Sequence, residues 1–368
     1  MFKIGVVFGG TSDEHEVSLA GAMSVLKAFK SIEGVKAQPI GIGKDGRWHV
    51  GSGALEYLIE HADKDKLFIR NTKDVEIGGP LDHHHNPPFD YIQGCDYILP
   101  IIHGRTSEDG VLQGFFETLG LDIIGCGILS SAACFDKAFL KEFLSGCGYK
   151  VSPGVKQEIE STGMQDTQVL YKDICAELGT NKLVIKPNDN GSSIGLSQAE
   201  NAQEFKEALM VAGKVTDQVV IEKYIKHREI VVGVIGQGDD ILISDLGESN
   251  ISTGKVYYYE DKYNAGSVCK TPAQLEPKLE EKIRKYTKEI YTLLECTGWA
   301  RIDFFVELET NDIYVNEINT IPGMSEPSVF PQIFKSKGYD YPTLIEMILE
   351  KAIQGNVAES SEPNVVNA

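Results

Sequence analysis

Two neighbouring strand patterns near the C-terminus constrain the fold more than any other feature of this chain. Residues 301–307 read Arg-Ile-Asp-Phe-Phe-Val-Glu, residues 313–319 read Ile-Tyr-Val-Asn-Glu-Ile-Asn, and a polar turn at 309–312 joins them. Alternating apolar and polar residues around such a turn predict an antiparallel hairpin. Because strand side chains alternate between faces, one face is expected to carry the site and the other the core. The first face should hold Arg301, Asp303, Phe305, Val315, Glu317 and Asn319, and the second Ile302, Phe304, Val306, Tyr314 and Ile318.

A register that sets Asp303 opposite Glu317 also sets Arg301 opposite Asn319. Two carboxylates that face each other across a strand pair repel, and burial makes this costly unless a cation lies between them. Mg²⁺ suits the position because it takes hard oxygen ligands, commonly one or two carboxylates together with substrate phosphates. The hairpin therefore predicts a magnesium site. An ordinary solvated strand face is the alternative that periodicity leaves open.

The rest of the chain reads as alternating strands and helices. With 368 residues and 42% hydrophobic content it is long enough for two or three domains. A strand over 1–8, glycines at 9–10 and a helix over 17–29 open an α/β domain, expected to span 1–125. We expect a second domain over 126–225 and a third over 226–354, with a long helix at 277–294. Residues 355–368 are rich in Ser, Glu, Asn and Pro and predict a disordered tail.

Charge and cysteine content indicate which binding partners and which cellular compartment to expect. The net charge of -19 disfavours nucleic acid as a partner. No run of 18 apolar residues is present, which disfavours a membrane span. The seven cysteines form no C-x-x-C pair, which favours free thiols over a disulfide framework or zinc site. We therefore expect a cytoplasmic protein whose partners are small molecules.

The loop after the strand 183–185 is the candidate phosphate site. It runs from Lys186 to Gly195 through Gly191-Ser192-Ser193, and backbone N–H groups in such a turn can close over phosphate oxygens. No G-x-x-x-x-G-K-[ST] motif is present. The same loop is formally G-x-S-x-G, which would make Ser193 the nucleophile of a hydrolase. Intervening polar residues, and the absence of any later histidine but His227, disfavour that alternative.

These segments, taken in order, resemble the D-alanine–D-alanine ligase family of ATP-grasp enzymes over nearly the whole chain. The resemblance rests on residues 8–18, His103-Gly104-Arg105 with Glu108-Asp109-Gly110, Asp136-Lys137, Lys186 with Gly191-Ser192-Ser193, residues 259–263, Arg301-Ile302-Asp303 and residues 316–324. It implies an α/β (α+β) ATP-grasp fold of three domains, opened by an N-terminal parallel-sheet domain.

The resemblance also implies a reaction and its cofactors. ATP phosphorylates the carboxylate of one D-alanine, and the amine of a second attacks that acyl phosphate through a tetrahedral intermediate. The product serves peptidoglycan precursor synthesis. Mg²⁺ is the implied metal, as two ions, with Mn²⁺ as a substitute. The family is usually dimeric, so we expect a homodimer.

Site roles carry over from matching motifs. Glu14 would hold the ammonium of the first D-alanine, linked to Ser192 and Tyr263, with His103 beside it. Lys137 and Lys186 would bind the α and β phosphates, aided by the Ser192-Ser193 loop, and Lys262 the γ phosphate. Glu222, Lys223, Tyr224 and Ile225 would line the adenine, and Glu229 would bind ribose. Asp303, Glu317 and Asn319 would ligate the metals, Arg301 and the Gly323 N–H would stabilise the oxyanion, and Ser328 with Val329 would face the second substrate.

The acceptor, the chemistry and three histidines leave alternatives open. The wording Glu326-Pro327 departs from the family pattern and bears on the acceptor pocket. Relatives that make D-alanyl-D-serine tend to carry a basic residue where Val329 stands, and those that make D-alanyl-D-lactate tend to lack the Lys262-Tyr263 pairing, so D-alanine is the expected acceptor. A nucleotide sensor without chemistry is a further alternative. We expect His15 and His227 to face solvent, and a purely structural His103 remains an alternative.

Overall fold

The computed structural model describes residues 1–62, 82–84, 86–159, 167–191, 194–249 and 269–361. Three sheets follow one another along the chain, and each lies inside one of the three expected domains. The described helices include none long and apolar enough to cross a membrane. All seven cysteines are free thiols, as predicted.

The N-terminal sheet has six strands in the order β4-β3-β2-β1-β5-β6. Strands β2, β1, β5 and β6 are parallel, as expected for this domain, and β3 and β4 add an antiparallel edge. Apolar residues of α1 and α2 share one core with β1, and those of α3 and α4 share another. The elements are β1 (Phe2–Gly9), α1 (His15–Ala28), η1 (Phe29–Ser31), β2 (Val35–Ile42), β3 (Trp48–Val50), α2 (Ser52–His61), β4 (Asp82–His84), α3 (Phe89–Ile92), β5 (Tyr97–Pro100), α4 (Val111–Thr118) and β6 (Asp122–Ile123).

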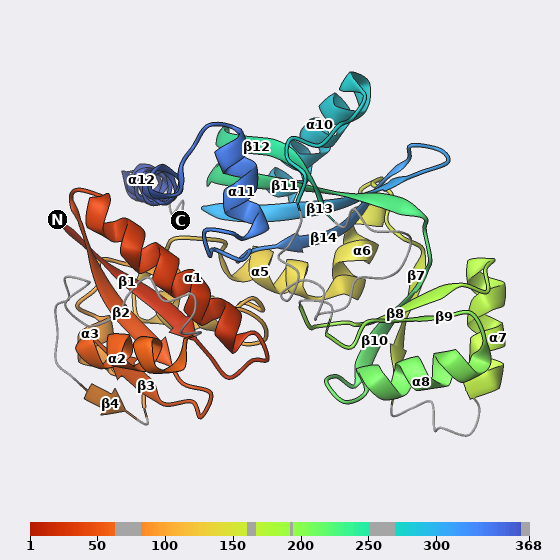
Figure 1. Cartoon of the computed structure of the whole chain (residues 1–368), viewed down its shortest axis with the longest axis horizontal. Helices are drawn as coiled ribbons and strands as arrows, with labels where there is room; N and C mark the ends of the chain where they lie inside the picture. The colour runs from red at the N-terminus through yellow and green to blue at the C-terminus, as the bar shows by residue number, and fades with distance from the viewer. Residues whose placement is uncertain (63–81, 85, 160–166, 192–193, 250–268, 362–368) are drawn as a thin grey trace, which may run out of the picture.

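The central sheet is antiparallel, with the strand order β7-β10-β8-β9. Helices α7 and α8 bury their apolar residues against it. Figure 1 shows this sheet and its two helices as the green lobe at the right. Its elements are β7 (Gly154–Glu158), α7 (Thr167–Leu178), β8 (Leu183–Pro187), β9 (Ser197–Ala199), α8 (Ala202–Ala212) and β10 (Gln218–Lys223).

The C-terminal sheet is antiparallel, in the order β12-β11-β13-β14. One face packs on α10 and also on α5 and α6, although we expected residues 128–146 in the central domain. The other face packs on α11 and α12. Its elements are α5 (Ile128–Phe135), α6 (Lys137–Gly146), β11 (His227–Gln237), β12 (Asp240–Ser249), α10 (Pro277–Leu293), β13 (Trp299–Glu307), β14 (Ile313–Asn319), α11 (Val329–Ser336) and α12 (Tyr341–Ser361).

Helix α12 joins the first and last domains. It contacts both α1 and β11, and its apolar residues belong to the core that also contains Val6 and Leu26. Figure 1 shows it between the N-terminal domain and the C-terminal sheet. The helix continues through Ser361, so residues 355–361 are helical and not the disordered tail predicted from their composition.

Candidate active site

The two C-terminal strands form the predicted hairpin in the predicted register. Arg301 pairs with Asn319, and Asp303 pairs with Glu317, along β13 and β14. A bulge follows, because Phe304 pairs with Val315 and leaves one extra residue on β14. The four polar residues therefore lie together at the end of the hairpin, as expected.

The bulge changes the faces that strict alternation predicts. Val315 is not beside Glu317 but packs with Phe304 in the core on the opposite face. Tyr314, expected in that core, is half-buried and pairs with Phe305 instead. Asn316 is the extra residue, and its Oδ1 accepts a hydrogen bond from Lys186 Nζ at 3.2 Å. The Asn316 side chain therefore lies on the polar face, whereas strict alternation would place it on the opposite face.

Arg301 and Asp303 form a two-point ion pair in the interior. Arg301 Nε lies 2.7 Å from Asp303 Oδ1, and its Nη2 lies 2.6 Å from Oδ2. Asn319 Nδ2 donates to the same Oδ2 at 3.3 Å. Burial raises the pKa of the Asp303 carboxyl to about 6, although Arg301 opposes the rise. Burial would lower the pKa of Arg301, but Asp303 raises it overall, so the guanidinium stays charged.

Two carboxyl groups of the N-terminal domain, Glu14 and Glu108, interact electrostatically, and Glu108 also interacts with Glu317 of the hairpin. Burial raises the pKa of Glu108 to about 8, and the charges of Glu14 and Glu317 add to the rise. Glu108 Oε2 also accepts from the Gly104 backbone N–H at 2.7 Å. Several acidic groups therefore share one interior region, which a bound cation would stabilise.

The donor set fits Mg²⁺ in a substrate-dependent site. Among the described residues no three His, Cys, Asp or Glu side chains gather into a metal cluster. Mg²⁺ does not require such a cage, because one or two carboxylates with substrate phosphates complete its shell. Asp303, Glu317 and the Asn319 amide supply hard oxygens, and the surplus of buried acid described above favours a divalent cation.

Three lysines gather across from the hairpin. Glu222 is 2% exposed and lies between Lys186 Nζ at 3.0 Å and Lys141 Nζ at 3.1 Å. Burial lowers the pKa of Lys141 and of Lys137. Burial would raise the pKa of Glu222, but the two lysine charges lower it below its usual range. The cluster carries more positive than negative charge and suits a polyanion.

Local structure holds Lys137 against the candidate phosphate loop, which follows β8. Asp136 caps α6 by accepting from the Phe139 N–H at 2.9 Å. Lys137 follows at the first position of the helix, and its Nζ donates to the Asn190 carbonyl at 2.6 Å. Asn188 anchors the same helix start by accepting from the Ala138 N–H at 2.9 Å. Four other predicted site residues, Ser192, Ser193, Lys262 and Tyr263, lie outside the described residues.

The N-terminal domain reaches the phosphate loop through Glu14 and Arg105. A Cβ atom added to Gly191 would lie 2.7 Å from Glu14 Oε2, so the Glu14 carboxylate lies directly against the loop. Arg105 forms an ion pair with Asp189 of the same loop. The backbone around Glu14 is tied to His103, whose carbonyl accepts from Ser12 Oγ at 2.7 Å. His103 is 4% exposed, and burial lowers its pKa.

The predicted adenine strand runs from β10 into β11. Glu222 is buried among lysines as described, whereas Lys223 is exposed and its backbone N–H donates to Pro153 at 2.8 Å. Tyr224 lies under Lys182, whose Nζ is 4.3 Å from the ring centroid, and Ile225 is buried. Glu229 acts electrostatically on Arg301 and Asp303. The segment therefore borders both the lysine cluster and the hairpin.

The loop after β14 carries the remaining predicted residues. Ser328 Oγ lies 2.6 Å from Ser325 Oγ, and a Cβ atom on Gly323 would lie 3.2 Å from Ser328 Oγ. Val329 begins α11 and packs against the core. Tyr341 of α12 fixes the loop by donating to the Met324 carbonyl at 2.6 Å.

Two histidines differ from expectation. His15 is 2% exposed instead of facing solvent, with Nδ1 2.6 Å from the Gly10 carbonyl oxygen. His227 is half-buried and stacks on Phe305 with ring centroids 3.6 Å apart. Both lie next to polar residues in the sequence, which explains the wrong prediction.

Three site residues were missed by sequence reasoning. Lys141 lies one helical turn after Lys137, a spacing that places both on one face of α6. Glu108 belongs to a quoted motif but had no role assigned. Asn316 joins the site only through the bulge.

The sequence of this chain matches two family models and several curated proteins. The D-ala D-ala ligase N-terminus family model matches residues 3–126, and the D-ala D-ala ligase C-terminus model matches residues 154–350. A D-alanine–D-alanine ligase of Clostridium novyi is 35% identical over 96% of this chain and 98% of its own. D-alanine–D-alanine ligase A of Escherichia coli K12 is 34% identical over 98% of each chain.

Solved structures agree with the sequence relatives. The VanG D-Ala:D-Ser ligase of Enterococcus faecalis superposes with a TM-score of 0.75 at 28% identity, over 95% of this chain and 99% of that one. The D-alanine–D-alanine ligase of Coxiella burnetii gives a TM-score of 0.74 at 25% identity, over 98% of this chain and 97% of that one.

Proposed function

This chain belongs to the D-alanine–D-alanine ligase family, and we propose that it joins two D-alanine molecules to D-alanyl-D-alanine at the expense of ATP, for cell-wall precursor synthesis. The observation that carries the proposal is a cluster of lysines around the buried Glu222 that lies against an acidic hairpin whose Asp303 is buried. Lys186 bridges the two, since its Nζ contacts both Glu222 and Asn316. The lysine cluster suits the phosphates of ATP, and the acidic hairpin suits the metal ion that accompanies them.

The lysines would bind the nucleotide. Lys137 and Lys186 are assigned to the α and β phosphates, and Lys262 to the γ phosphate. Lys141 adds a third positive charge to the cluster, and it pairs with the same Glu222 carboxylate as Lys186. Glu222, Lys223, Tyr224 and Ile225 would line the adenine, and Glu229 would hold the ribose. Such groups act by charge and position, as phosphoryl transfer requires.

Asp303, Glu317 and Asn319 would hold the metal, as two Mg²⁺ ions. Bound Mg²⁺ supplies positive charge where the phosphates meet these carboxylates. Burial raises the pKa of Asp303 to about 6, and the charge of Arg301 favours its ionised form. A bound cation favours the ionised form further.

The first D-alanine would lie between the N-terminal domain and the phosphate loop. Glu14 would receive its ammonium, with Ser192 and Tyr263 linked to Glu14 and His103 beside the substrate. A carboxylate oxygen of this D-alanine attacks the γ phosphorus, the bond to the bridging oxygen breaks, and ADP leaves. The mixed anhydride that forms carries the activated acyl group.

The second D-alanine would approach from the loop after β14, where Ser328 faces its carboxylate and Val329 lines the pocket. Its amine, after loss of a proton, attacks the acyl carbon and forms the C–N bond. Arg301 and the Gly323 N–H would stabilise the oxyanion that develops. Collapse of the tetrahedral intermediate breaks the C–O bond and releases phosphate.

The likeness to the VanG ligase makes D-serine the competing acceptor. Val329 supports D-alanine, because the relatives that use D-serine tend to carry a basic residue at that position. Initial rates of phosphate release should be measured with Mg-ATP and D-alanine, alone and with D-serine or D-lactate added, and the products identified by mass. Absence of D-alanine-stimulated release would refute the ligase function. Preferential formation of D-alanyl-D-serine would refute the acceptor assignment alone.

A pair of variants tests the metal role. Glu317→Gln removes one carboxylate from the proposed site and is expected to abolish turnover while leaving the circular dichroism spectrum unchanged. Glu309→Gln makes the same change in the exposed turn of the same hairpin and should leave the rate unchanged. Near-normal turnover of Glu317→Gln would remove this residue from the metal site.

We also propose a homodimer, on the strength of family membership. Light scattering coupled to gel filtration should give twice the chain mass of 40.4 kDa. A mass of one chain at micromolar concentration would refute it.

A further inference from the structure

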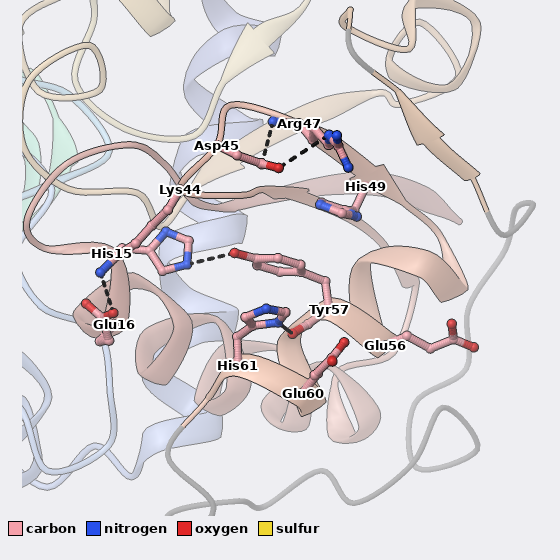
Figure 2. A pocket seen from close by; sticks show the side chains of 10 residues that line it. All are labelled: His15, Glu16, Lys44, Asp45, Arg47, His49, Glu56, Tyr57, Glu60 and His61. Atoms are coloured by element: carbon pink, nitrogen blue, oxygen red, sulfur yellow. Dashed lines mark hydrogen bonds and ion pairs between the residues drawn. The ribbon is translucent and has the colours of Figure 1, made fainter.

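A cavity of about 480 Å³ lies in the N-terminal domain, lined by polar residues that include His15, the residue after Glu14. Its lining includes His15, His49, Tyr57 and His61. Figure 2 shows Tyr57 reaching from α2 toward His15, with a hydrogen bond between them. The proposed reaction uses none of these side chains.

Tyr57 is held firmly in this cavity. Its ring stacks between two imidazoles, with centroids 4.4 Å from His49 and 4.1 Å from His61. His61 Nδ1 also lies 2.9 Å from the Tyr57 carbonyl oxygen. Two stacked neighbours leave the ring little freedom to rotate, so they hold its hydroxyl group in one position.

His15 connects the Tyr57 hydroxyl to the turn between β1 and α1, which begins at Gly10. Its Nε2 lies 3.2 Å from the Tyr57 hydroxyl, and its Nδ1 lies 2.6 Å from the Gly10 carbonyl oxygen. A carbonyl only accepts, so Nδ1 carries the proton and Nε2 accepts from the tyrosine. Burial lowers the pKa of His15, which favours the neutral ring that this arrangement needs. Burial likewise raises the pKa of Tyr57 and keeps its hydroxyl protonated.

The turn that His15 closes is the one that presents Glu14. Helix α1 begins at His15, and Glu14 occupies its N-cap position without a side-chain capping bond. The Glu14 carboxylate instead lies against Gly191 of the phosphate loop. Both anchors of the turn, Gly10 and His15, are therefore tied to Tyr57.

We propose that Tyr57, acting through His15, is a positioning residue for the first D-alanine: it fixes the turn from Gly10 to His15 and so aims the Glu14 carboxylate at the substrate ammonium. The inference rests on the proposed function and deepens it. Tyr57 itself does not touch the substrate. Loss of its hydroxyl should weaken the first D-alanine site and leave the nucleotide site intact.

The test is Tyr57→Phe, which keeps the stacked ring and removes only the hydroxyl. Initial rates of ADP release are fitted over D-alanine concentration to two sites, which gives a separate KM for each D-alanine. The first KM should rise about five- to tenfold, the size expected for one lost hydrogen bond, with the KM values for the second D-alanine and for ATP unchanged. Glu60→Gln, which changes a carboxylate of the same cavity away from the tyrosine hydroxyl, is the matched control and should behave as the natural protein.

A double-mutant cycle separates positioning from general damage. His15→Asn keeps an N–H donor near Gly10 but loses the acceptor for Tyr57, so it should raise the first KM like Tyr57→Phe. In the His15→Asn background, Tyr57→Phe should add nothing, because the two residues act in series. Additive effects, an unchanged first KM, or a loss confined to thermal stability would each overturn the inference. If the natural protein forms no ADP with D-alanine, the proposed function fails instead, which is a different result.

Discussion

Glu222 offers the sharpest test of the buried charges, because it is one carboxylate between two lysines. Its side chain is 2% exposed, with Lys186 at 3.0 Å and Lys141 at 3.1 Å. Glu222→Gln keeps the volume and an acceptor oxygen but removes the carboxylate that pairs with two buried ammonium groups. Breaking a buried pair from one side costs about 3–5 kcal/mol. We take about 3 kcal/mol, since the amide still accepts a hydrogen bond.

That cost converts to a measurable shift in the melting temperature. An unfolding entropy of about 2.1 cal/mol/K per residue gives about 0.8 kcal/mol/K for the whole chain. A loss of about 3 kcal/mol then lowers the apparent Tm by about 4 °C if the chain unfolds as one unit. The KM for ATP should also rise, because Lys186 loses the carboxylate that orients it.

The pH dependence identifies the cause. Burial would raise the pKa of Glu222, but Lys141 and Lys186 lower it below its ordinary value of 4.5. A carboxyl with a lower pKa in the folded state stabilises the fold fully above about pH 4.5, and this contribution is lost as the pH falls through the folded-state pKa. The gap between natural protein and variant should therefore be constant from pH 6 to 8 and shrink below about pH 4.5.

The measurement is differential scanning fluorimetry of both proteins across that pH range. Asp312→Asn is the control, because it removes the acid of an exposed ion pair, Lys150 with Asp312 at 2.5 Å, and should change little at any pH. An unchanged Tm for Glu222→Gln at pH 7, or a shift of the same size at pH 4, would refute the reasoning.

Three further variants test two close backbone contacts and one charge of the lysine cluster. Gly298→Ala puts a Cβ atom 2.6 Å from the Gly125 backbone at a φ of +66°, so thermal melts should show a loss of about 1–3 kcal/mol; an unchanged melt contradicts this contact. Gly191→Ala puts a Cβ atom 2.7 Å from Glu14 Oε2, so the first D-alanine KM should rise about tenfold; an unchanged value would mean that Glu14 does not face the loop. Lys141→Met removes one charge of the lysine cluster and should raise the KM for ATP several-fold in steady-state assays, and an unaltered KM would show that its charge does not reach the nucleotide.

Local patterns were enough to predict much of the fold. The helix expected over 277–294 is α10 (Pro277–Leu293), and the strand expected at the start is β1 (Phe2–Gly9). Regular periodicity and clear end signals make such elements predictable. The sheet edge was not predictable in this way, because residues 48–50 and 82–84 are too short to show a period.

Burial of single polar residues was harder to predict than secondary structure. His15 has polar neighbours in the sequence and was expected in solvent, yet it is 2% exposed. Its burial depends on Tyr57 and Gly10, which supply partners for both ring nitrogens. A buried polar group is tolerated when it is hydrogen-bonded, and those partners come from segments that sequence periodicity does not bring together.

Asn316 shows a signal that the sequence does contain. Strict alternation cannot place adjacent residues on one face of a strand, yet Asn316 and Glu317 are adjacent polar residues between the apolar Val315 and Ile318. Only an extra residue in the ladder sends both apolar neighbours to the core, and the bulge after Asp303 supplies it. One strand can then give an amide to Lys186 and a carboxylate to the proposed metal at consecutive positions. Two adjacent polar residues inside an apolar strand therefore predict a bulge, and a bulge next to facing carboxylates favours a site over a solvated surface.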